Sequence, residues 1–157
     1  MEAARPAVPD DIPFVAAIYD RRRTEMEGQR GAEMFLAREA SSEPVEKRVA
    51  AAMDDERSRV VVGTYDDVVF GYAVVHFEAL SDGTDVAALT DFVVDAEIRG
   101  SGIGEAMMNM VVDEARAAGC RGIDSVALPG DRSTKNFFES FGLKARMLTV
   151  HYSFVDE

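Results

Sequence analysis

The sequence predicts an α/β (α+β) fold with a mixed, mostly antiparallel central sheet flanked by helices. Three features lead to this prediction: strand-like runs follow one another across short turns, an apolar period of about 3.6 residues comes next, and strand and helix patterns then alternate. The 157 residues are 47% hydrophobic. This length and composition suit a single domain over residues 1–157, with a core that needs neither disulfides nor a metal.

The first third of the chain favours helices after one short strand. Ala3–Val8 is predicted as an edge strand, where its proline is tolerated. Pro9–Asp11 supplies the turn and cap of a first helix. Residues 21–55 are rich in helix-forming residues, and the Ser41–Pro44 turn separates a second helix that ends near Met53.

Three antiparallel strands are predicted in the middle of the chain. Arg59–Tyr65 and Val68–Phe77 are β-branched, and Asp66–Asp67 between them has the length of a two-residue hairpin connection. The turn at Ser81–Gly83 then leads into a third strand, Asp85–Asp95.

The last third alternates between helices and strands. Apolar residues from Ile103 to Ala118 fall on one face of a helix. Gly122–Leu128 is predicted as a short buried strand and Arg132–Phe141 as a short helix. Leu143–Phe154 is predicted to form one or two closing strands.

Composition and charge disfavour several classes of protein. The net charge of −12 would repel DNA or RNA, so we expect no nucleic-acid partner. No apolar run approaches the roughly 20 residues of a membrane span, and the first residues lack a secretion signal, so we expect no membrane partner. Cys120 is the single cysteine and cannot build a thiolate zinc site. We therefore expect a cytoplasmic protein without a metal.

The acidic residues are concentrated before Arg99. Residues 1–97 carry a net charge of −11, whereas residues 98–146 carry +1. One interpretation is a solvated acidic surface. The other is that residues 1–97 attract cationic ligands, whereas the residues after them tolerate an anionic ligand.

A glycine-rich turn, Arg99–Gly104, lies between a predicted strand and a predicted helix. Glycines allow several N–H groups to face one point, and the helix N-terminus adds unpaired donors, so the turn suits a phosphate or diphosphate. A dinucleotide-binding fingerprint would need a third small residue, and a P-loop would need a Gly-Lys pair; the sequence has neither at this place. A turn that holds no ligand is the alternative.

Two segments resemble motifs of the GCN5-related N-acetyltransferase (GNAT) family. Residues 94–104, VDAEIRGSGIG, resemble the family's acetyl-CoA signature, Arg/Gln-x-x-Gly-x-Gly/Ala, at the start of a helix. Residues 131–143, DRSTKNFFESFGL, resemble its later helical motif, which ends in Gly-Phe. The hairpin with Gly71 and Tyr72 resembles the strands before the signature, so the likeness covers roughly residues 59–143.

The resemblance implies a sheet splayed between the fourth and fifth strands, with acetyl-CoA as cosubstrate lying in the gap. The pantetheine arm would pair with Phe92, Val93 and Val94. The diphosphate would be held by Arg99, Gly100, Ser101, Gly102, Ile103 and Gly104, and a side chain at Gly102 would fill its cradle. Asp131, Lys135 and Phe138 of the later motif would also belong to the cosubstrate site. The resemblance further implies a primary-amine acceptor, a small molecule or a peptide, and makes a homodimer plausible.

Two positions depart from the family pattern. Asp131 stands where the family has Asn, and Phe138 stands where it has the Tyr that protonates the leaving thiolate. Tyr152 and Ser133 are candidate substitute acids. A thiol pKa of about 8.5 makes the thiolate a tolerable leaving group, so the missing acid would slow an enzyme without forbidding turnover.

The general base is predicted among acidic residues of the strands. Asp91 shares one face of its predicted strand with Leu89 and Val93, and apolar neighbours would raise the pKa of a carboxyl there. Glu78 is the second candidate. The sequence therefore predicts an acetyl-CoA-dependent N-acetyltransferase acting on a cationic amine; the alternative is a weak or inactive acyl-CoA-binding or sensing domain of the same fold.

Overall fold

The computed structural model describes residues 1–155. Two short turns, Pro9–Asp11 and Ala96–Ile98, are 3₁₀-helical, and Phe35–Glu39 is π-helical. The strands and α-helices, in chain order, are β1 (Glu2–Pro6), α1 (Ile12–Met26), α2 (Ala32–Met34), α3 (Val45–Asp54), β2 (Ser58–Tyr65), β3 (Val68–Ala79), β4 (Asp85–Val94), α4 (Ile103–Ala117), β5 (Ile123–Asp124) and α5 (Arg132–Ser140).

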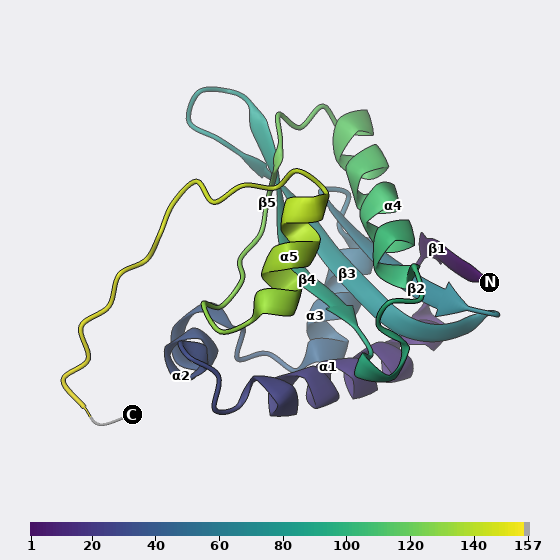
Figure 1. The fold of residues 1–157 in the computed structure, drawn as a ribbon. Coiled ribbons are helices and arrows are strands. Elements are labelled where there is room, and N and C mark those ends of the chain that lie inside the picture. The colour runs from purple at the N-terminus through teal and green to yellow at the C-terminus, as the bar shows by residue number, and fades with distance from the viewer. Residues whose placement is uncertain (156–157) are drawn as a thin grey trace.

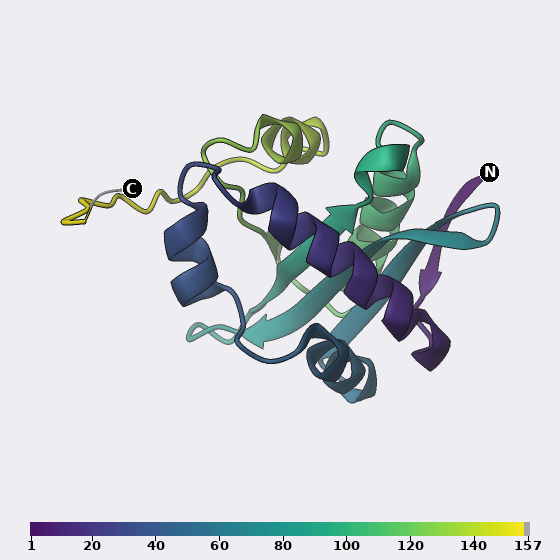
Figure 2. The same cartoon turned by 90° about the horizontal axis from the view of Figure 1, so that it is seen from below.

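The five strands form one sheet in the order β1-β2-β3-β4-β5. Neighbouring strands are antiparallel except β4 and β5, which are parallel. Helices α4 and α5 cover one face of the sheet, and α1 and α3 cover the other (Figures 1 and 2). The predicted fold class, a mixed and mostly antiparallel sheet flanked by helices, is confirmed.

Each sheet face carries its own apolar core because side chains alternate along the strands. On β2, Val61 packs toward α4, whereas Val60 and Val62 pack toward α1 and α3. On β3, Ala73 and Val75 join the first core. Within residues 1–155, no helix combines the length and the apolar content that crossing a bilayer requires.

Two paired glycines let the start of α4 lie close to the sheet. Gly63 of β2 pairs with Gly71 of β3. A Cβ at Gly63 would lie 2.4 Å from the Ile103 Cγ2, and a Cβ at Gly71 would lie 2.8 Å from the Met107 Sδ. Any larger residue at either position would push α4 away from the sheet, so these glycines determine how close the turn before α4 lies to the sheet.

The predicted hairpin turn is confirmed. Asp66 and Asp67 join β2 to β3, and both have positive φ angles of 49° and 67°. Two consecutive left-handed residues form the turn whose twist matches that of the flanking strands.

The last predicted strands differ from the structure. β5 is only two residues long, where Gly122–Leu128 was expected. Leu143–Phe154 was predicted to form closing strands, and this prediction is wrong: the chain leaves α5 and runs as an extended, exposed segment (Figure 1). Apolar alternation indicates a strand, but a strand also needs a backbone partner, and the rest of the described chain supplies none for this segment.

Candidate active site

A β-bulge in β4 opens the sheet beside β5. Val74 of β3 pairs with Asp91, but Val75 pairs with Leu89, so Thr90 is an extra residue in β4. A bulge bends its strand and increases the local twist. β5 pairs only with Ala87 and Ala88, before the bulge. Beyond it, the two strands separate, and residues 92–94 border an open space instead of a fifth strand.

That space is a cleft of about 230 Å³. It is bounded by the end of β4, by the turn that leads into α4, by the start of α5 and by α1. Its lining residues are Arg22, Phe92, Val93, Val94, Ile98, Arg99, Gly100, Ser101, Gly102, Gly104, Glu105, Asp131, Ser133, Thr134 and Phe137.

The turn at one end of the cleft presents unpaired hydrogen-bond donors. Gly100 and Gly102 have φ angles of +87° and +94°, which favour glycine. Gly102 is the N-cap of α4 and provides no side-chain cap, so the first N–H groups of the helix have no partner within it. The Ser101 Oγ is buried and has no hydrogen-bond partner among the described residues. Such a turn can accept an anion.

Two glycines of this turn face different surroundings. A Cβ at Gly104 would lie 3.1 Å from the Phe137 Cε2 and 3.7 Å from the Val94 Cγ2, inside the cleft. A Cβ at Gly102 would instead lie 3.1 Å from the Cγ of Glu2 in β1. The expectation that a side chain at Gly102 would fill the cradle therefore applies to Gly104, because the backbone turns between the two.

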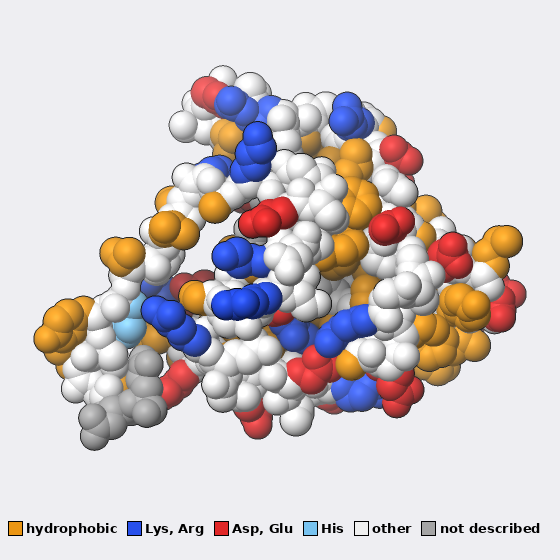
Figure 3. All heavy atoms as spheres, viewed as in Figure 1, with side chains coloured by type: hydrophobic (Ala, Val, Ile, Leu, Met, Phe, Trp, Pro, Cys, Tyr) orange, Lys and Arg blue, Asp and Glu red, His pale blue; other side chains and the backbone are white. Residues whose placement is uncertain are grey.

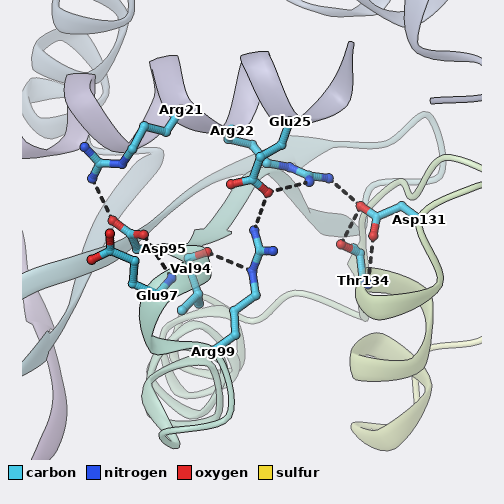
Figure 4. Close-up of polar contacts among 9 residues, drawn as sticks. All are labelled: Arg21, Arg22, Glu25, Val94, Asp95, Glu97, Arg99, Asp131 and Thr134. Carbon is cyan, nitrogen blue, oxygen red and sulfur yellow. Dashed lines mark hydrogen bonds and ion pairs between the residues drawn. The ribbon is translucent and has the colours of Figure 1, made fainter. Parts of the chain in front are cut away.

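Helix α1 is tied to the mouth of the cleft by what we call the α1 ion-pair cluster: Arg21, Arg22 and Glu25 of α1 with Asp95, Arg99 and Asp131 (Figure 4). An Arg21 nitrogen lies 2.7 Å from a carboxylate oxygen of Asp95, and an Arg99 nitrogen lies 2.8 Å from the Glu25 Oε2. Arg22 pairs with Asp131 and lies 3.7 Å from Glu25. Arg99 also donates to the Val94 carbonyl at 3.2 Å. All three arginines are thus held by carboxylates, and two of them, Arg22 and Arg99, line the rim of the cleft.

Asp131 links the cluster to α5. Its Oδ1 accepts from the Thr134 backbone N–H at 3.2 Å, and its Oδ2 accepts from the Thr134 hydroxyl at 2.7 Å, which caps the helix. Burial raises the pKa of the Asp131 carboxyl, but the two Thr134 hydrogen bonds and the Arg22 charge outweigh it and lower that pKa below its ordinary value. The carboxylate therefore stays ionised and acts as a structural link.

Asp91 lies in polar surroundings instead of the expected apolar ones. Arg48 of α3 donates to both carboxylate oxygens of Asp91, at 2.7 and 2.8 Å. The Tyr72 hydroxyl donates to the same carboxylate at 2.8 Å, and the Thr90 hydroxyl donates at 3.0 Å. Leu89, expected on the same face, packs on the other side, because the bulge at Thr90 inverts the alternation. Four donors hold the Asp91 carboxylate in place, and it in turn fixes the positions of Arg48 and Tyr72.

Burial and the Asp91 charge shift the pKa values of two groups around Asp91. It raises the pKa of the Tyr72 hydroxyl well above its ordinary value, and the Asp91 charge raises it further. Burial also lowers the pKa of the Arg48 guanidinium, but the Asp91 hydrogen bonds and charge outweigh it, so the net shift is upward. Tyr72 therefore remains protonated and Arg48 charged across the physiological range.

Two of the other predicted catalytic residues lie outside the cleft. Glu78 pairs with Val86 of β4, six residues before Phe92, which places it roughly 20 Å along the strand from the cleft. Tyr152 lies on the exposed segment after α5 and is 80% exposed. Neither side chain lines the cleft.

The predicted cosubstrate residues divide into two groups. Most of them line the cleft: the three predicted residues of β4, Asp131, and the predicted residues of the glycine turn except Ile103. The Ile103 side chain is buried in the core below the turn. Lys135 is exposed on α5 and does not line the cleft. Phe138 is buried behind the cleft wall, with its ring centroid 6.0 Å from that of Phe92.

A second hollow, of about 500 Å³, lies between α1 and the residues before α3. Its charged lining residues are Asp20, Arg23, Glu43 and Glu46. The hollow reaches Tyr19, whose ring centroid is 5.7 Å from the Arg48 Cζ. Arg48 in turn binds Asp91, which does not line the cleft but lies two residues before Val93, which does.

Sequence reasoning missed three residues of this site, Arg22, Glu25 and Arg48. Their partners lie far along the chain, so no local spacing reveals them. The available signal for the first two was the cluster of four charged residues in the five-residue stretch Arg21–Glu25 of a predicted helix.

Comparisons with known proteins identify the family. A family model described as the acetyltransferase (GNAT) family matches residues 15–143. The chain belongs to the GNAT acetyltransferase family. A comparison with curated proteins gave no significant match.

Solved GNAT-fold structures match over nearly the full chain. A variant of the BH1408 protein from Bacillus halodurans is 21% identical, with 97% of this chain and 99% of that chain covered and a TM-score of 0.81. An aminoglycoside acetyltransferase, meta-AAC0020 from an uncultured soil metagenomic sample, in complex with sisomicin, is 15% identical, with 99% and 97% covered and a TM-score of 0.72. A ribosomal-protein-alanine N-acetyltransferase from Brucella melitensis biovar Abortus 2308 is 12% identical, with 98% and 100% covered and a TM-score of 0.69. At these identities, the likeness concerns the fold.

Proposed function

We propose that this GNAT protein transfers the acetyl group of acetyl-CoA to a primary amine. The observation that carries the proposal is the splayed cleft that ends on a turn with unpaired helix N–H groups and a buried, unpartnered Ser101 hydroxyl. These donors fit a diphosphate, because oxyanions accept several hydrogen bonds at a helix N-terminus.

Each part of the cleft has a role in holding the cosubstrate. The N–H groups of the turn bind the diphosphate, and Arg22 and Arg99 lie at the rim, where Glu25 and Asp131 hold them. Residues 92–94 offer a strand edge to the pantetheine arm, because no fifth strand pairs with them there. The cosubstrate supplies a thioester, and a β4 N–H group near Val93 polarises its carbonyl.

The amine acceptor approaches from the acidic hollow between α1 and α3. The charged side chains that line this hollow are three carboxylates, those of Asp20, Glu43 and Glu46, and one cation, Arg23. The excess of negative charge favours a cationic acceptor such as a polyamine, an aminoglycoside-like compound or a basic peptide end. The similarity to an aminoglycoside acetyltransferase and to a ribosomal-protein acetyltransferase supports the same acceptor classes. Asp91 acts as a positioning residue through Arg48, and the proton of the attacking amine leaves to water.

Thiol release tests the proposal. The chain is incubated with acetyl-CoA and a panel of polyamines, aminoglycosides and peptides, with neutral alcohols of similar size as controls, and free CoA thiol is measured. We expect release with cationic amines and none with the alcohols. Release at the uncatalysed rate with every amine would refute the enzyme activity.

A second function, acyl-CoA binding with little or no turnover, is favoured by one observation. Phe138 carries no hydroxyl where the family places its general acid. Calorimetric binding of CoA together with the absence of thiol release would favour this alternative over the first.

We further propose that the chain works in the cytoplasm and as a homodimer. The single cysteine suits a reducing compartment. The exposed apolar side chains after α5 (Figure 3) would be buried by contact with a second copy.

A further inference from the structure

The hydrogen-bond ladder between β4 and β5 ends abruptly at Leu89. Ala88 pairs with Asp124, and no later residue belongs to β5. The bonds of a parallel ladder are evenly spaced, so the next bond would run from the Val126 N–H to the Leu89 carbonyl. That bond is not formed, and the Val126 N–H has no backbone acceptor among residues 1–155.

A side chain takes the place of that backbone donor. The Ser125 hydroxyl donates to the Leu89 carbonyl at 2.9 Å, in a partly buried position. Serine hydroxyls compete with regular secondary structure in this way, because they offer a backbone carbonyl an alternative partner. The Leu89 carbonyl is therefore satisfied without Val126, and the chain after Ser125 leaves the sheet (Figure 1).

The departure of this segment opens the cleft. Residues 125–130 connect β5 to α5, and none of them belongs to a strand or a helix. β4 continues past this point, so its edge borders no further strand of the described chain there. The hydrogen bond between Ser125 and Leu89, which we call the vertex bond, thus lies where the two chain segments diverge. The part of β4 that lines the cleft begins three residues later, at Phe92.

We infer that the Ser125 hydroxyl sets the inner end of the cleft and thereby limits the length of the acyl group that the cleft admits. The acyl limit rests on the proposed function, in which the diphosphate lies at the turn before α4 and the pantetheine arm lies along residues 92–94. The thioester end of the arm then points along β4 toward the vertex bond. Leu89 and Phe92 are roughly 10 Å apart in an extended strand, so the acyl group lies in a short space that the paired strands close.

Removing the hydroxyl should extend the ladder. Without the vertex bond, the partly buried Leu89 carbonyl needs another donor, and the Val126 N–H is the one that a parallel ladder supplies. The Ser125→Val substitution also favours an extended backbone, because β-branched side chains pack well on a pleated sheet. The vertex would move toward Phe92 by one residue, about 3.3 Å, and the space for the acyl group would shorten by the same length.

Amide hydrogen exchange of the free chain, followed by NMR, tests the first step. Ser125→Thr and Ser125→Val have nearly the same shape, and only Ser125→Thr keeps the hydroxyl. In the unsubstituted chain and in Ser125→Thr, the Val126 amide should exchange without protection. In Ser125→Val, its exchange should slow by about 10-fold or more. Equal protection of the Val126 amide in the two variants would overturn the inference, because the hydroxyl would then not decide where the ladder ends.

Calorimetric binding of CoA and of acetyl-, butyryl-, hexanoyl- and octanoyl-CoA tests the acyl limit. CoA itself should bind Ser125→Thr and Ser125→Val with equal affinity. The affinity of each variant should fall beyond a certain acyl length, and that length should be shorter in Ser125→Val. For the longest acyl group that Ser125→Thr accommodates, the dissociation constant of Ser125→Val should be higher by about 10-fold or more, because the chain would be overpacked against the extended ladder.

The outcomes separate this inference from the proposed function. Equal acyl limits in the two variants, or an affinity that does not fall with acyl length in either, would overturn the role of Ser125. If both variants bound CoA in that case, the proposed function would stand. An unsubstituted chain that does not bind CoA would refute the proposed function and the acyl limit together, while the exchange of the Val126 amide would still show whether the hydroxyl ends the ladder.

Discussion

Replacing Gly104 tests the proposed cosubstrate site most directly. In Gly104→Val, the new side chain would lie between Phe137 and Val94, both of which line the cleft. Gly104 has an ordinary helical backbone in the first turn of α4, so the substitution does not force an unfavourable φ angle. The variant should therefore fold while its cleft is narrowed beside the diphosphate-binding amides.

The expected loss of affinity follows from the donors that would be displaced. A hydrogen bond to a charged acceptor contributes about 1.5–3 kcal/mol, and a diphosphate moved off the turn would lose at least two of them. The loss of about 3–6 kcal/mol corresponds to a dissociation constant raised roughly 10²- to 10⁴-fold. The free energy of unfolding should change by no more than about 1 kcal/mol, because a better helix former offsets the close contact with Phe137.

Isothermal titration calorimetry with CoA measures the effect, and a glycine variant outside the cleft is the control. Gly83→Ala places a side chain at a φ of +86°, which costs roughly 1–2 kcal/mol of stability. Gly83 lies in the turn between β3 and β4, so its variant should bind CoA normally. If Gly104→Val bound CoA as tightly as the unsubstituted chain, the placement of the ligand in this cleft would be wrong.

Three further predictions concern single side chains. Arg48→Met leaves the Asp91 carboxylate buried without its cation and should lower the free energy of unfolding, measured in urea, by about 3 kcal/mol. Adding Asp91→Leu to the same chain should restore most of the lost stability, and an Arg48→Met variant as stable as the unsubstituted chain would contradict the prediction. Phe138→Tyr should raise kcat in the thiol-release assay by much less than the roughly 10²–10⁴-fold of general acid catalysis, because Phe138 is buried behind the cleft wall. A gain within that range would mean that the new hydroxyl reaches the leaving thiolate. Arg5 of β1 donates to both carboxylate oxygens of Asp11, at 2.7 and 2.9 Å, and these hydrogen bonds lower the pKa of the Asp11 carboxyl below its value of about 3.9 in the unfolded chain. The resulting stabilisation is present above about pH 4 and is lost as pH falls through the folded-state pKa. Acid titration of Asp11→Asn should therefore show a shallower loss of stability in that range.

Local patterns predicted most of the fold. The β-branched runs that became β2 and β3, and the Asp66–Asp67 turn between them, depend on neighbouring residues only, and their predicted bounds agree with the structure to within a few residues. The same holds for α4, whose apolar period continues for fifteen residues. The prediction failed for the segment after α5, because the alternation of apolar residues indicates a strand but does not reveal whether a second strand lies beside it to share backbone hydrogen bonds.

The candidate site was less predictable because its decisive features are long-range. The bulge at Thr90 depends on the register of β4 against β3, and this single extra residue puts Leu89 and Asp91 on opposite faces. The Arg48–Asp91 pair spans 43 residues of sequence and the Arg22–Asp131 pair spans 109. The glycine turn, by contrast, was recognisable because its residues are contiguous.

The α1 ion-pair cluster explains why the backbone turn should dominate affinity. Glu25 and Asp131 already neutralise Arg22 and Arg99, so a diphosphate gains little net attraction from the two guanidinium groups unless it displaces those carboxylates. The carboxylates instead hold both arginines at the rim, which reduces the entropy lost when the ligand binds. The N–H groups at the start of α4 have no such competitor, because no side chain caps that helix. Removing an arginine should therefore weaken CoA binding less than filling the space at Gly104.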